Sequence, residues 1–380
     1  MERNFKRFGI KNWIDHGWKV KVFDITKFKS PEFWRHIDGK KISHNFEGLK
    51  FFNNIEELLF AVKNLQNKVV FIDLLDFTSR NNIIRKAIHA HGVIVKLRLG
   101  YIPKGLGEKK FLKLLKLVRN PISFVTKLIS FVKNKINHIN SKKFDPDYLV
   151  VGGTKSLANI DEKKTSIIKA HNFDYDHFIE GEHVKLNKNS NFLVFLDEDA
   201  AYHSDYKKLN LKPFVKADNY YPIIDNGLNK IAKSLNLNIK IAAHPRSNYE
   251  NKSVKFKFPT IKNNTFELIR DADVVVGHSS TVIQYALLLK KPIIIVTTDE
   301  IQKASYAKHW KQLINSLALT LGKEVINLNN LSNLNNYKNY LNVDHKKYDL
   351  YIENFIKIKG SPEKKLWNIV IEHIQRDLSL

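Results

Sequence analysis

Three short polar clusters in the second half of the chain could carry chemistry, because each directly follows a run of apolar residues. They are LDED at 196–199, AAHPR at 242–246 and GHSST at 277–281. Such apolar runs predict buried strands of a parallel sheet, and ligands bind beyond the carboxyl ends of those strands. We therefore expect the three clusters to lie together at one end of a sheet.

The third cluster has the residue types of a phosphate site. Val274–Val276 predicts a buried strand, and a helix is expected right after the glycine that follows. The N-terminus of a helix offers unpaired N–H groups and a positive dipole end to an anion, and hydroxyls add donors. Ordinary capping by a serine explains one hydroxyl residue, but not three. The candidate phosphate ligands are Gly277, His278, Ser279, Ser280 and Thr281.

The second cluster places His244 before Pro245, which holds the preceding residue extended and ends the strand. A histidine on such a stiff turn can donate a hydrogen bond or a proton to a departing phosphate oxygen. Arg246 can pair with a phosphate or with a sugar carboxylate. The alternative is a turn histidine whose ring is satisfied by the backbone.

The first cluster offers a general base for an acceptor hydroxyl, from Asp197, Glu198 or Asp199. Two alternatives stand beside that role: a D-x-D metal chelate and a solvated acidic turn. His203 and Asp205 follow closely and are further candidates for the same site. We expect no metal site and no cofactor other than the donor substrate.

The elements that position these clusters alternate between strand and helix. Strands are expected at 18–26, 68–77, 93–99, 147–153, 191–199, 239–246, 273–280 and 292–300. Helices are expected at 55–65, 81–92, 223–236, 265–272, 281–291 and 361–378, the last one opening with Ser-Pro-Glu. This alternation predicts an α/β protein with parallel sheets and two Rossmann-like domains that face a cleft.

The expected domains are an N-terminal acceptor domain at 1–180 and a nucleotide-sugar-binding domain at 190–358. The polar segment 172–191 is expected to be irregular and to hold the boundary. A C-terminal helix at 360–380 is expected to return to the first domain. A basic helical insert at 108–143 interrupts the first domain, since 109–143 carries ten Lys or Arg and no acidic residue.

The ordered acidic, His-Pro and serine clusters resemble the motif set of bacterial sialyltransferases and related transferases that use CMP-activated acidic sugars. The resemblance covers 191–300 and implies the two-domain fold called GT-B. It also implies a base within Asp197–Asp199, and a CMP phosphate held by His244 and Ser279–Thr281. The family's acidic motif ends in glycine, whereas this chain has Asp199 and Ala200 after Asp197-Glu198.

The resemblance implies transfer of a sialic, pseudaminic, legionaminic or Kdo-type sugar from a CMP-sugar to a surface glycan of capsule or lipooligosaccharide. The alternatives are a transferase that uses a UDP-sugar or other NDP-sugar, a sugar-nucleotide 2-epimerase, and a basic binding protein without activity. No stacking motif for nucleic acid is found, so nucleic acid is not an expected partner.

The net charge of +25 predicts an anionic partner, such as nucleic acid, a phospholipid surface or a phosphorylated substrate, although an AT-rich genome would also enrich the chain in lysine. The insert's apolar residues recur at helical spacing, which predicts basic amphipathic helices at an anionic membrane surface, although core helices with solvated lysines would show the same pattern. The chain has no cysteine, no apolar stretch long enough to span a membrane, and no apolar signal segment after Met1. We expect a cytoplasmic, peripheral protein at the inner face of the cell membrane, with a lipid-linked glycan acceptor.

Overall fold

A computed structural model describes most of the chain. The described residues are 2–37, 46–66, 68–75, 81–100, 102–103, 145–158, 160–181, 190–208, 211–304, 307–331 and 340–379. The insert at 108–143 lies outside them, so its helical and membrane-binding character stays a prediction. Among the described residues, no helix is both long and apolar enough to cross a membrane.

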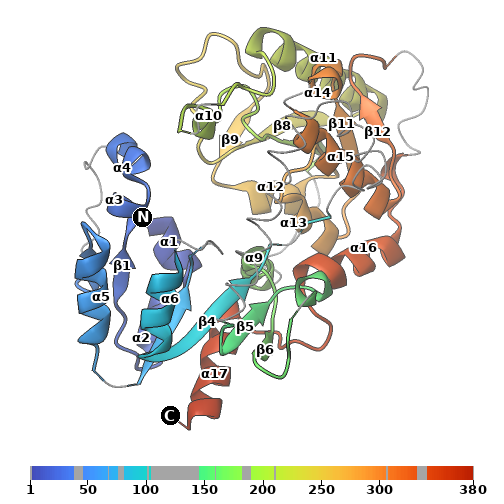
Figure 1. The fold of residues 1–380 in the computed structure, drawn as a ribbon. Coiled ribbons are helices and arrows are strands. Elements are labelled where there is room, and N and C mark those ends of the chain that lie inside the picture. The colour runs from blue at the N-terminus through green and yellow to red at the C-terminus, as the bar shows by residue number, and fades with distance from the viewer. Residues whose placement is uncertain are drawn as a thin grey trace, which may run out of the picture. The chain divides into compact units, whose positions relative to one another are not determined.

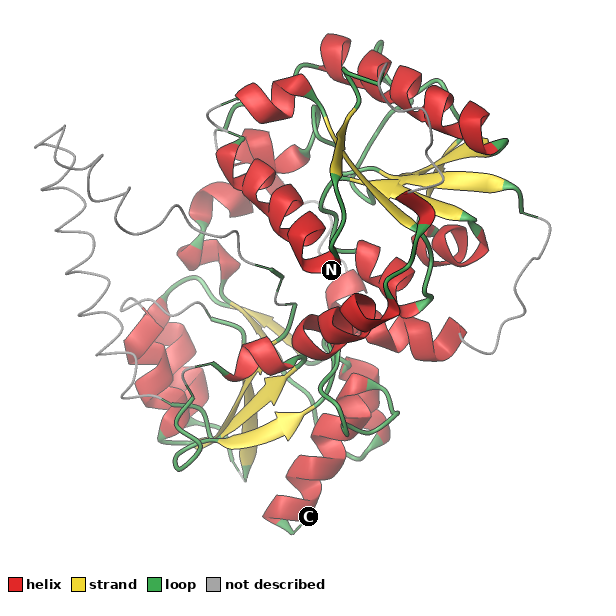
Figure 2. Ribbon diagram, turned by 90° about the vertical axis from the view of Figure 1, so that its right-hand side faces the viewer, coloured by secondary structure: helices red, strands yellow, loops and turns green. Residues whose placement is uncertain are grey.

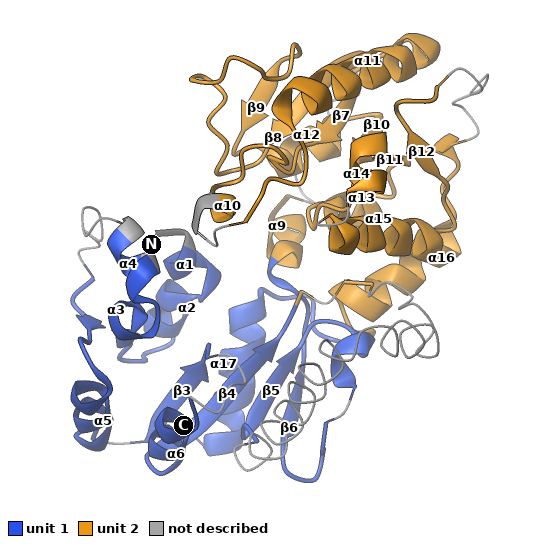
Figure 3. Cartoon of the chain, turned by 45° about the horizontal axis from the view of Figure 1, so that its top comes forward, with its two compact units in different colours: residues 1–99, 108–173, 360–380 blue, residues 100–107, 174–359 orange. Residues whose placement is uncertain are grey.

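The chain divides into two compact units, coloured separately in Figure 3. Unit 1 comprises 1–99, 108–173 and 360–380, and unit 2 comprises 100–107 and 174–359. Each unit has its own parallel sheet with helices packed on it (Figures 1 and 2). The expected α/β architecture with two domains is confirmed.

Unit 1 contains a four-stranded parallel sheet in the order β3-β4-β5-β6 and a separate parallel pair, β1-β2. The strands are β1 (Val22–Asp24), β2 (Leu49–Phe51), β3 (Val69–Asp73), β4 (Gly92–Arg98), β5 (Tyr148–Val151) and β6 (Ser166–Lys169). The helical segments are α1 (Glu2–Arg7), α2 (Ile10–Asp15), α3 (Thr26–Lys29), α4 (Pro31–Ile37), α5 (Ile55–Lys63), α6 (Asn82–His89), the 3-10 turn η3 (Thr154–Leu157) and α17 (Leu366–Leu378).

The C-terminal helix α17 belongs to unit 1, as expected. Its buried Trp367, Val370 and Ile374 pack in one cluster with Val95 and Val150 of the sheet. The helix begins at Leu366 rather than at the predicted Ser-Pro-Glu start. Residues 361–365 precede its first turn as irregular chain.

Unit 2 contains a six-stranded parallel sheet in the order β12-β11-β10-β7-β8-β9. Its strands are β7 (Phe192–Leu196), β8 (Asn238–Ala243), β9 (Thr260–Lys262), β10 (Val274–Gly277), β11 (Ile293–Thr297) and β12 (Val325–Asn327). The helical segments are α9 (Phe173–Gly181), α10 (Ser204–Lys208), α11 (Ala217–Leu235), α12 (Thr265–Asp271), α13 (Ile283–Leu288), α14 (Asp299–Lys303), α15 (Lys308–Leu321), α16 (His345–Tyr351) and the π turn η5 (Ile352–Ile356).

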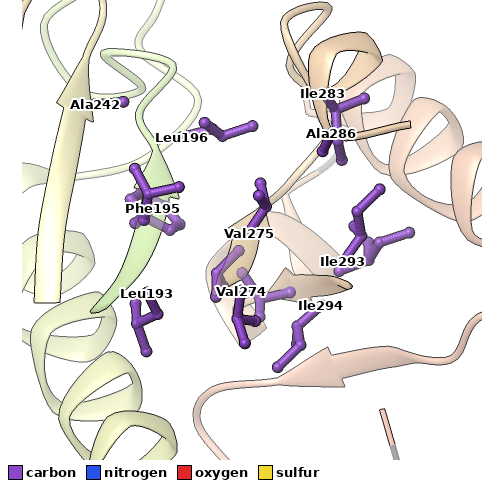
Figure 4. Packing of buried hydrophobic residues seen from close by; sticks show 14 of the residues in the cluster. Leu193, Phe195, Leu196, Ala242, Val274, Val275, Ile283, Ala286, Ile293 and Ile294 are labelled. Atoms are coloured by element: carbon purple, nitrogen blue, oxygen red, sulfur yellow. The ribbon is translucent and has the colours of Figure 1, made fainter. Parts of the chain in front are cut away.

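The three central strands β7, β10 and β11 are buried along their whole lengths. A parallel sheet covered by helices on both faces requires apolar residues at every position, which explains the continuous runs FLVFL, VVV and IIIV. Figure 4 shows Phe195 of β7 and Val275 of β10 on adjacent strands, and Ile283 and Ala286 of α13 belong to the same buried cluster. The three polar clusters follow directly after strands of this buried core.

The segment after Asn172 was expected to be irregular, and that prediction is wrong for its first part, because α9 spans Phe173–Gly181. Tyr175 and Phe178 lie one helical turn apart with their ring centroids separated by 5.4 Å, and both pack on the unit 2 core. Burial of these two rings stabilises a helix whose polar residues conceal its apolar face in the sequence.

Candidate functional site

The three polar clusters follow three neighbouring strands. Strand β7 pairs with β10 on one side and with β8 on the other, with Leu196 opposite both Gly277 and Ala242. Because the strands are parallel and in this register, the chain leaves all three at the same level of the sheet. The acidic, His-Pro and serine loops therefore meet at the carboxyl end of the central strands of unit 2.

Asp197 binds these loops together and is almost fully buried. Its Oδ1 accepts a hydrogen bond from the Asp199 amide at 2.8 Å. Its Oδ2 accepts from the Tyr249 hydroxyl at 2.7 Å and from the His244 amide at 3.1 Å. Burial raises the pKa of Asp197, and these three donors oppose that rise. With both oxygens engaged, Asp197 is suited to fix the His244 turn rather than to accept a proton.

Asp199 has a left-handed backbone, with φ at +51°. Glycine takes this conformation without strain, and Asp and Asn tolerate it better than most residues. The side chain is 2% exposed, and its Oδ1 has no hydrogen-bond partner. Burial and the neighbouring charge of Asp197 raise the pKa of Asp199 to about 7. A solvated acidic turn does not fit this environment.

Glu198 points to the serine loop. Its Oε1 accepts a hydrogen bond from the Ser279 amide at 2.8 Å. Burial raises the pKa of Glu198 to about 7, the charge of Asp197 adds to the rise, and the Ser279 amide opposes it. A half-buried carboxylate with a pKa near neutrality has the protonation behaviour of a general base.

The serine loop is longer than the sequence predicts, because α13 begins at Ile283 rather than directly after Gly277. The Ile283 and Gln284 amides donate to the carbonyls of Ser280 and Thr281, which form the turn before the helix. The Ser279 hydroxyl is buried and has no partner, and Thr281 is exposed. Amide and hydroxyl donors therefore gather in a loop that already holds the Glu198 carboxylate.

His278 was a candidate phosphate ligand, but the structure places it inside the core with no exposed surface. Its Nε2 is 2.8 Å from the Tyr220 hydroxyl and its Nδ1 is 2.7 Å from the Val296 carbonyl oxygen. Burial lowers the pKa of His278 to about 4, so the ring is neutral at pH 7. Both ring nitrogens lie within hydrogen-bond distance of protein oxygens, and the role of His278 as a phosphate ligand stays a prediction.

The His-Pro turn joins the segment after the acidic loop. The His203 and His244 ring centroids are 4.8 Å apart, and Arg246 Nη1 donates to Asp205 Oδ1 at 3.0 Å. Arg246 and Asp205 are both exposed, whereas the His203 side chain is 21% exposed. The structure thus brings these four predicted residues together beside Asp197.

Tyr249 was not predicted, although its hydroxyl makes the shortest hydrogen bond to Asp197. Its ring contacts Tyr221 of α11, at a centroid distance of 5.9 Å. A lone tyrosine five residues beyond His244 gives no sequence signal, because the loop that returns it under the acidic turn is irregular. The described residues contain no group of three or more His, Asp or Glu side chains arranged to hold a metal ion.

Comparisons with known proteins give distant structural likenesses. No family model matches the chain, and no curated protein is significantly similar to it in sequence. A variant of the wall teichoic acid polymerase TagF is 13% identical, with 98% of this chain and 85% of that chain covered and a TM-score of 0.49. The spinosyn forosaminyltransferase SpnP is 11% identical, with 86% and 79% covered and a TM-score of 0.41. A UDP-N-acetylglucosamine 2-epimerase is 10% identical, with 95% and 89% covered and a TM-score of 0.45.

Proposed function

We propose that this chain is a glycosyltransferase of the GT-B type that transfers a sugar from a nucleotide donor to a glycan hydroxyl. The observation that carries the proposal is the placement of Glu198. A carboxyl group with a pKa of about 7 lies 2.8 Å from an amide of a loop rich in hydroxyl and amide donors. A base and an anion site are thereby adjacent, which group transfer from a phosphate-linked donor requires.

In the proposed reaction, the acceptor oxygen forms a bond to the anomeric carbon of the donor sugar. The bond from that carbon to the phosphate oxygen breaks, and the nucleotide leaves with the electron pair. Glu198 takes the proton of the acceptor hydroxyl. Asp197 is a positioning residue, because all of its described hydrogen bonds fix the backbone and Tyr249.

The leaving phosphate is proposed to lie between the serine loop and the His244 turn. Ser279, Ser280 and Thr281 supply amide and hydroxyl donors, and His244 supplies a ring N–H. When phosphate takes the Ser279 amide, Glu198 loses a hydrogen bond that lowers its pKa and gains a negative neighbour. Both changes make Glu198 a stronger base while the donor is bound.

The donor that the order of the motifs favours is a CMP-activated acidic sugar. Arg246 at the edge of the site has a guanidinium of the kind that pairs with a carboxylate, provided that it exchanges its bond to Asp205. A surface glycan on a lipid carrier is the proposed acceptor. The basic insert would hold the enzyme at the anionic inner face of the membrane.

Binding of CMP, UDP, GDP and dTDP to the purified full chain tests the donor class. We expect CMP to bind at least tenfold more tightly than the other three, and the His244→Ala variant to lose most of that affinity. Tight binding of UDP instead would replace the donor but keep the transferase. No binding of any nucleotide would refute the proposal, and a 2-epimerised sugar nucleotide without transfer would assign an epimerase.

A further inference from the structure

A buried tryptophan of unit 2 lies beside the proposed reaction site. Trp310 on α15 is 5% exposed, and its ring centroid is 5.1 Å from that of His278 and 5.6 Å from that of Phe214. His278 directly precedes Ser279, whose amide donates to Glu198 at 2.8 Å. Packing against these rings therefore holds the indole next to the loop that binds the proposed base.

The indole N–H of Trp310 is a buried donor without an ordinary hydrogen bond. Nε1 is shielded from solvent and meets no acceptor at normal length and angle. This N–H is the one polar group of the side chain, and it can only donate. A buried donor left unpaired costs free energy, so it gains when a charged acceptor moves within reach.

The acceptor that this N–H faces is Glu198. Burial raises the pKa of Glu198, the Ser279 amide opposes that rise, the charge of Asp197 adds to it, and the N–H groups of Trp310 and Ser280 oppose it. A donor that lowers the pKa of a carboxyl group favours its ionised form. The indole is thus close enough to act on Glu198, although the contact is too long or too bent for an ordinary hydrogen bond. Catalytic hydrogen bonds often have this form in a free enzyme and tighten in the working complex.

The two tyrosine hydroxyls nearest in effect to Glu198 are engaged elsewhere. The charge of Glu198 contributes to the raised pKa values of Tyr206 and Tyr220, so both side chains face it. The Tyr206 hydroxyl donates to the Ala200 carbonyl oxygen at 2.9 Å, and the Tyr220 hydroxyl is 2.8 Å from His278 Nε2. Among these three side chains, only the Trp310 N–H can turn to Glu198 without leaving another partner.

We propose that Trp310 is the positioning residue of the proposed base, and that its indole N–H takes over the hydrogen bond to Glu198 when the donor phosphate engages the Ser279 amide. This inference rests on the proposed function and adds to it a residue outside the three polar clusters. Glu198 then loses one donor and gains another, so the carboxylate keeps its place while it ionises. The second donor also limits the rise in the pKa of Glu198 that the phosphate charge would cause.

Proton–nitrogen NMR of the indole groups tests the contact in the full chain without nucleotide. The chain has five tryptophans, and the other four belong to unit 1: Trp13, Trp18, Trp34 and Trp367. We expect the Trp310 N–H signal, identified by its absence in Trp310→Phe, to move downfield as pH rises, with a midpoint near 7. Glu198→Gln should abolish this titration. The signals of Trp13 and Trp18, whose Nε1 atoms are also buried without a partner, should move far less and serve as internal controls.

The pH profile of the reaction gives a second measurement. Trp310→Phe keeps an aromatic ring but removes the N–H that favours ionised Glu198. The midpoint of kcat/KM against pH should therefore rise from near 7 by about half a unit to one unit. Trp34→Phe on α4 is the matched control in unit 1 and should leave the midpoint unchanged. Thermal unfolding checks that each variant is folded, and Trp310→Tyr is a second variant without the indole.

The outcomes separate the positioning role from the proposed function. A Trp310 signal that does not titrate overturns the role, as does one that still titrates near pH 7 in Glu198→Gln, which would mean that it senses Asp199. At pH 8, added CMP should move the signal further downfield, and an unchanged signal with CMP bound overturns the exchange of donors. If the titration depends on Glu198 but no nucleotide binds, the proposed function fails and the exchange with it, while the contact between Trp310 and Glu198 stands.

Discussion

Each unit buries a carboxylate at the carboxyl end of a strand, but the two units surround it differently. In unit 1, Asp73 ends β3 and accepts hydrogen bonds from Arg85 Nε and Lys96 Nζ, both at 3.0 Å. In unit 2, Asp197 follows β7, and its hydrogen bonds from the described residues all come from neutral donors, with Glu198 and Asp199 beside it. The first site neutralises its charge with cations, and the second accumulates acids.

This difference separates a structural group from a reactive one. Buried charges that are paired and hydrogen-bonded hold elements together and offer nothing to a ligand. Burial raises the pKa values of Glu198 and Asp199 to about 7, although Lys252 and Lys262 lower that of Asp199, and groups with such pKa values gather where protons move. A buried carboxylate at the carboxyl end of a strand thus gives structural support in unit 1, on the edge strand β3, and belongs to the proposed reaction site in unit 2, on the interior strand β7.

The largest effect should follow from Glu198→Gln. This change keeps the shape of the side chain but removes the base, so turnover should fall about 10²- to 10⁴-fold. The free energy of unfolding at pH 8 should not fall, since the variant no longer ionises a desolvated carboxyl group. Steady-state kinetics and thermal unfolding measure the two quantities. Turnover within threefold of the wild type would move the base to Asp199.

Asp73→Asn should have the opposite profile. It leaves Arg85 and Lys96 without their shared carboxylate, and removal of one partner from a buried ionic group costs about 3–5 kcal/mol. We expect a clear fall in the unfolding temperature of unit 1 and turnover per folded molecule within about twofold of the wild type. A large loss of turnover in fully folded protein would give the unit 1 cluster a direct role.

The pH dependence of turnover and of stability should show the next largest effect, and it should come from Glu198 in unit 2. Because the folded pKa of Glu198 is raised to about 7, kcat/KM should rise about tenfold per pH unit below 7 and level off above it. The same shift acts against stability: the folded state holds a proton that the unfolded state releases from about pH 4.5 upward. The contribution of Glu198 to the free energy of unfolding should therefore be at its maximum below about pH 4.5 and should be lost as pH rises to 7. The Glu198→Gln variant should lack the slope in kcat/KM and the Glu198 share of the stability slope, while Asp199, whose pKa is also raised to about 7, keeps its own share.

The sequence predicts the features that depend on residues close together in the chain, and it misses those that depend on contacts between distant elements. Continuous apolar runs predicted the long central strands, and their polar ends placed the three clusters at one end of a sheet. The three-residue strands β9 and β12 were missed, because so few residues carry no periodic signal. The cations around Asp73 were missed as well, since Arg85 and Lys96 stand on separate elements that only the tertiary fold brings together.

Burial and backbone conformation explain two further differences between the predicted site and the structure, at His278 and at Asp199. His278 follows a strand just as His244 does, yet its ring turns inward between Tyr220 and Trp310. In the sequence both histidines follow an apolar run that predicts a strand, so the pattern alone does not tell which ring is buried. The departure at Asp199 from the glycine of the resembling family has a local reason, because the backbone there is left-handed and an aspartate still tolerates it.

Tyr249→Phe should have a moderate effect. The variant removes one of three hydrogen bonds to Asp197 and leaves a buried acceptor short of a donor, which costs about 1–3 kcal/mol. Since Asp197 fixes the His244 turn, turnover should fall roughly tenfold while the pH at half-maximal kcat/KM stays near 7. A shift of that midpoint by more than one unit would place Tyr249 in proton transfer instead. Lys308→Ala on α15 is a matched exposed control.

Treatment with EDTA should have the smallest effect, with turnover within about twofold of the untreated enzyme. A D-x-D chelate would use the carboxylates of Asp197 and Asp199, but both Asp197 oxygens already accept hydrogen bonds from the protein. A divalent cation would have to break those bonds, which hold the acidic loop and the His244 turn in place. The serine-loop amides and His244 offer donors to the phosphate charge without a cation. Turnover abolished by EDTA and restored by magnesium or manganese would show that the loop rearranges around a metal, and the contrast between the two units would then be one of bound cation type rather than of acid accumulation.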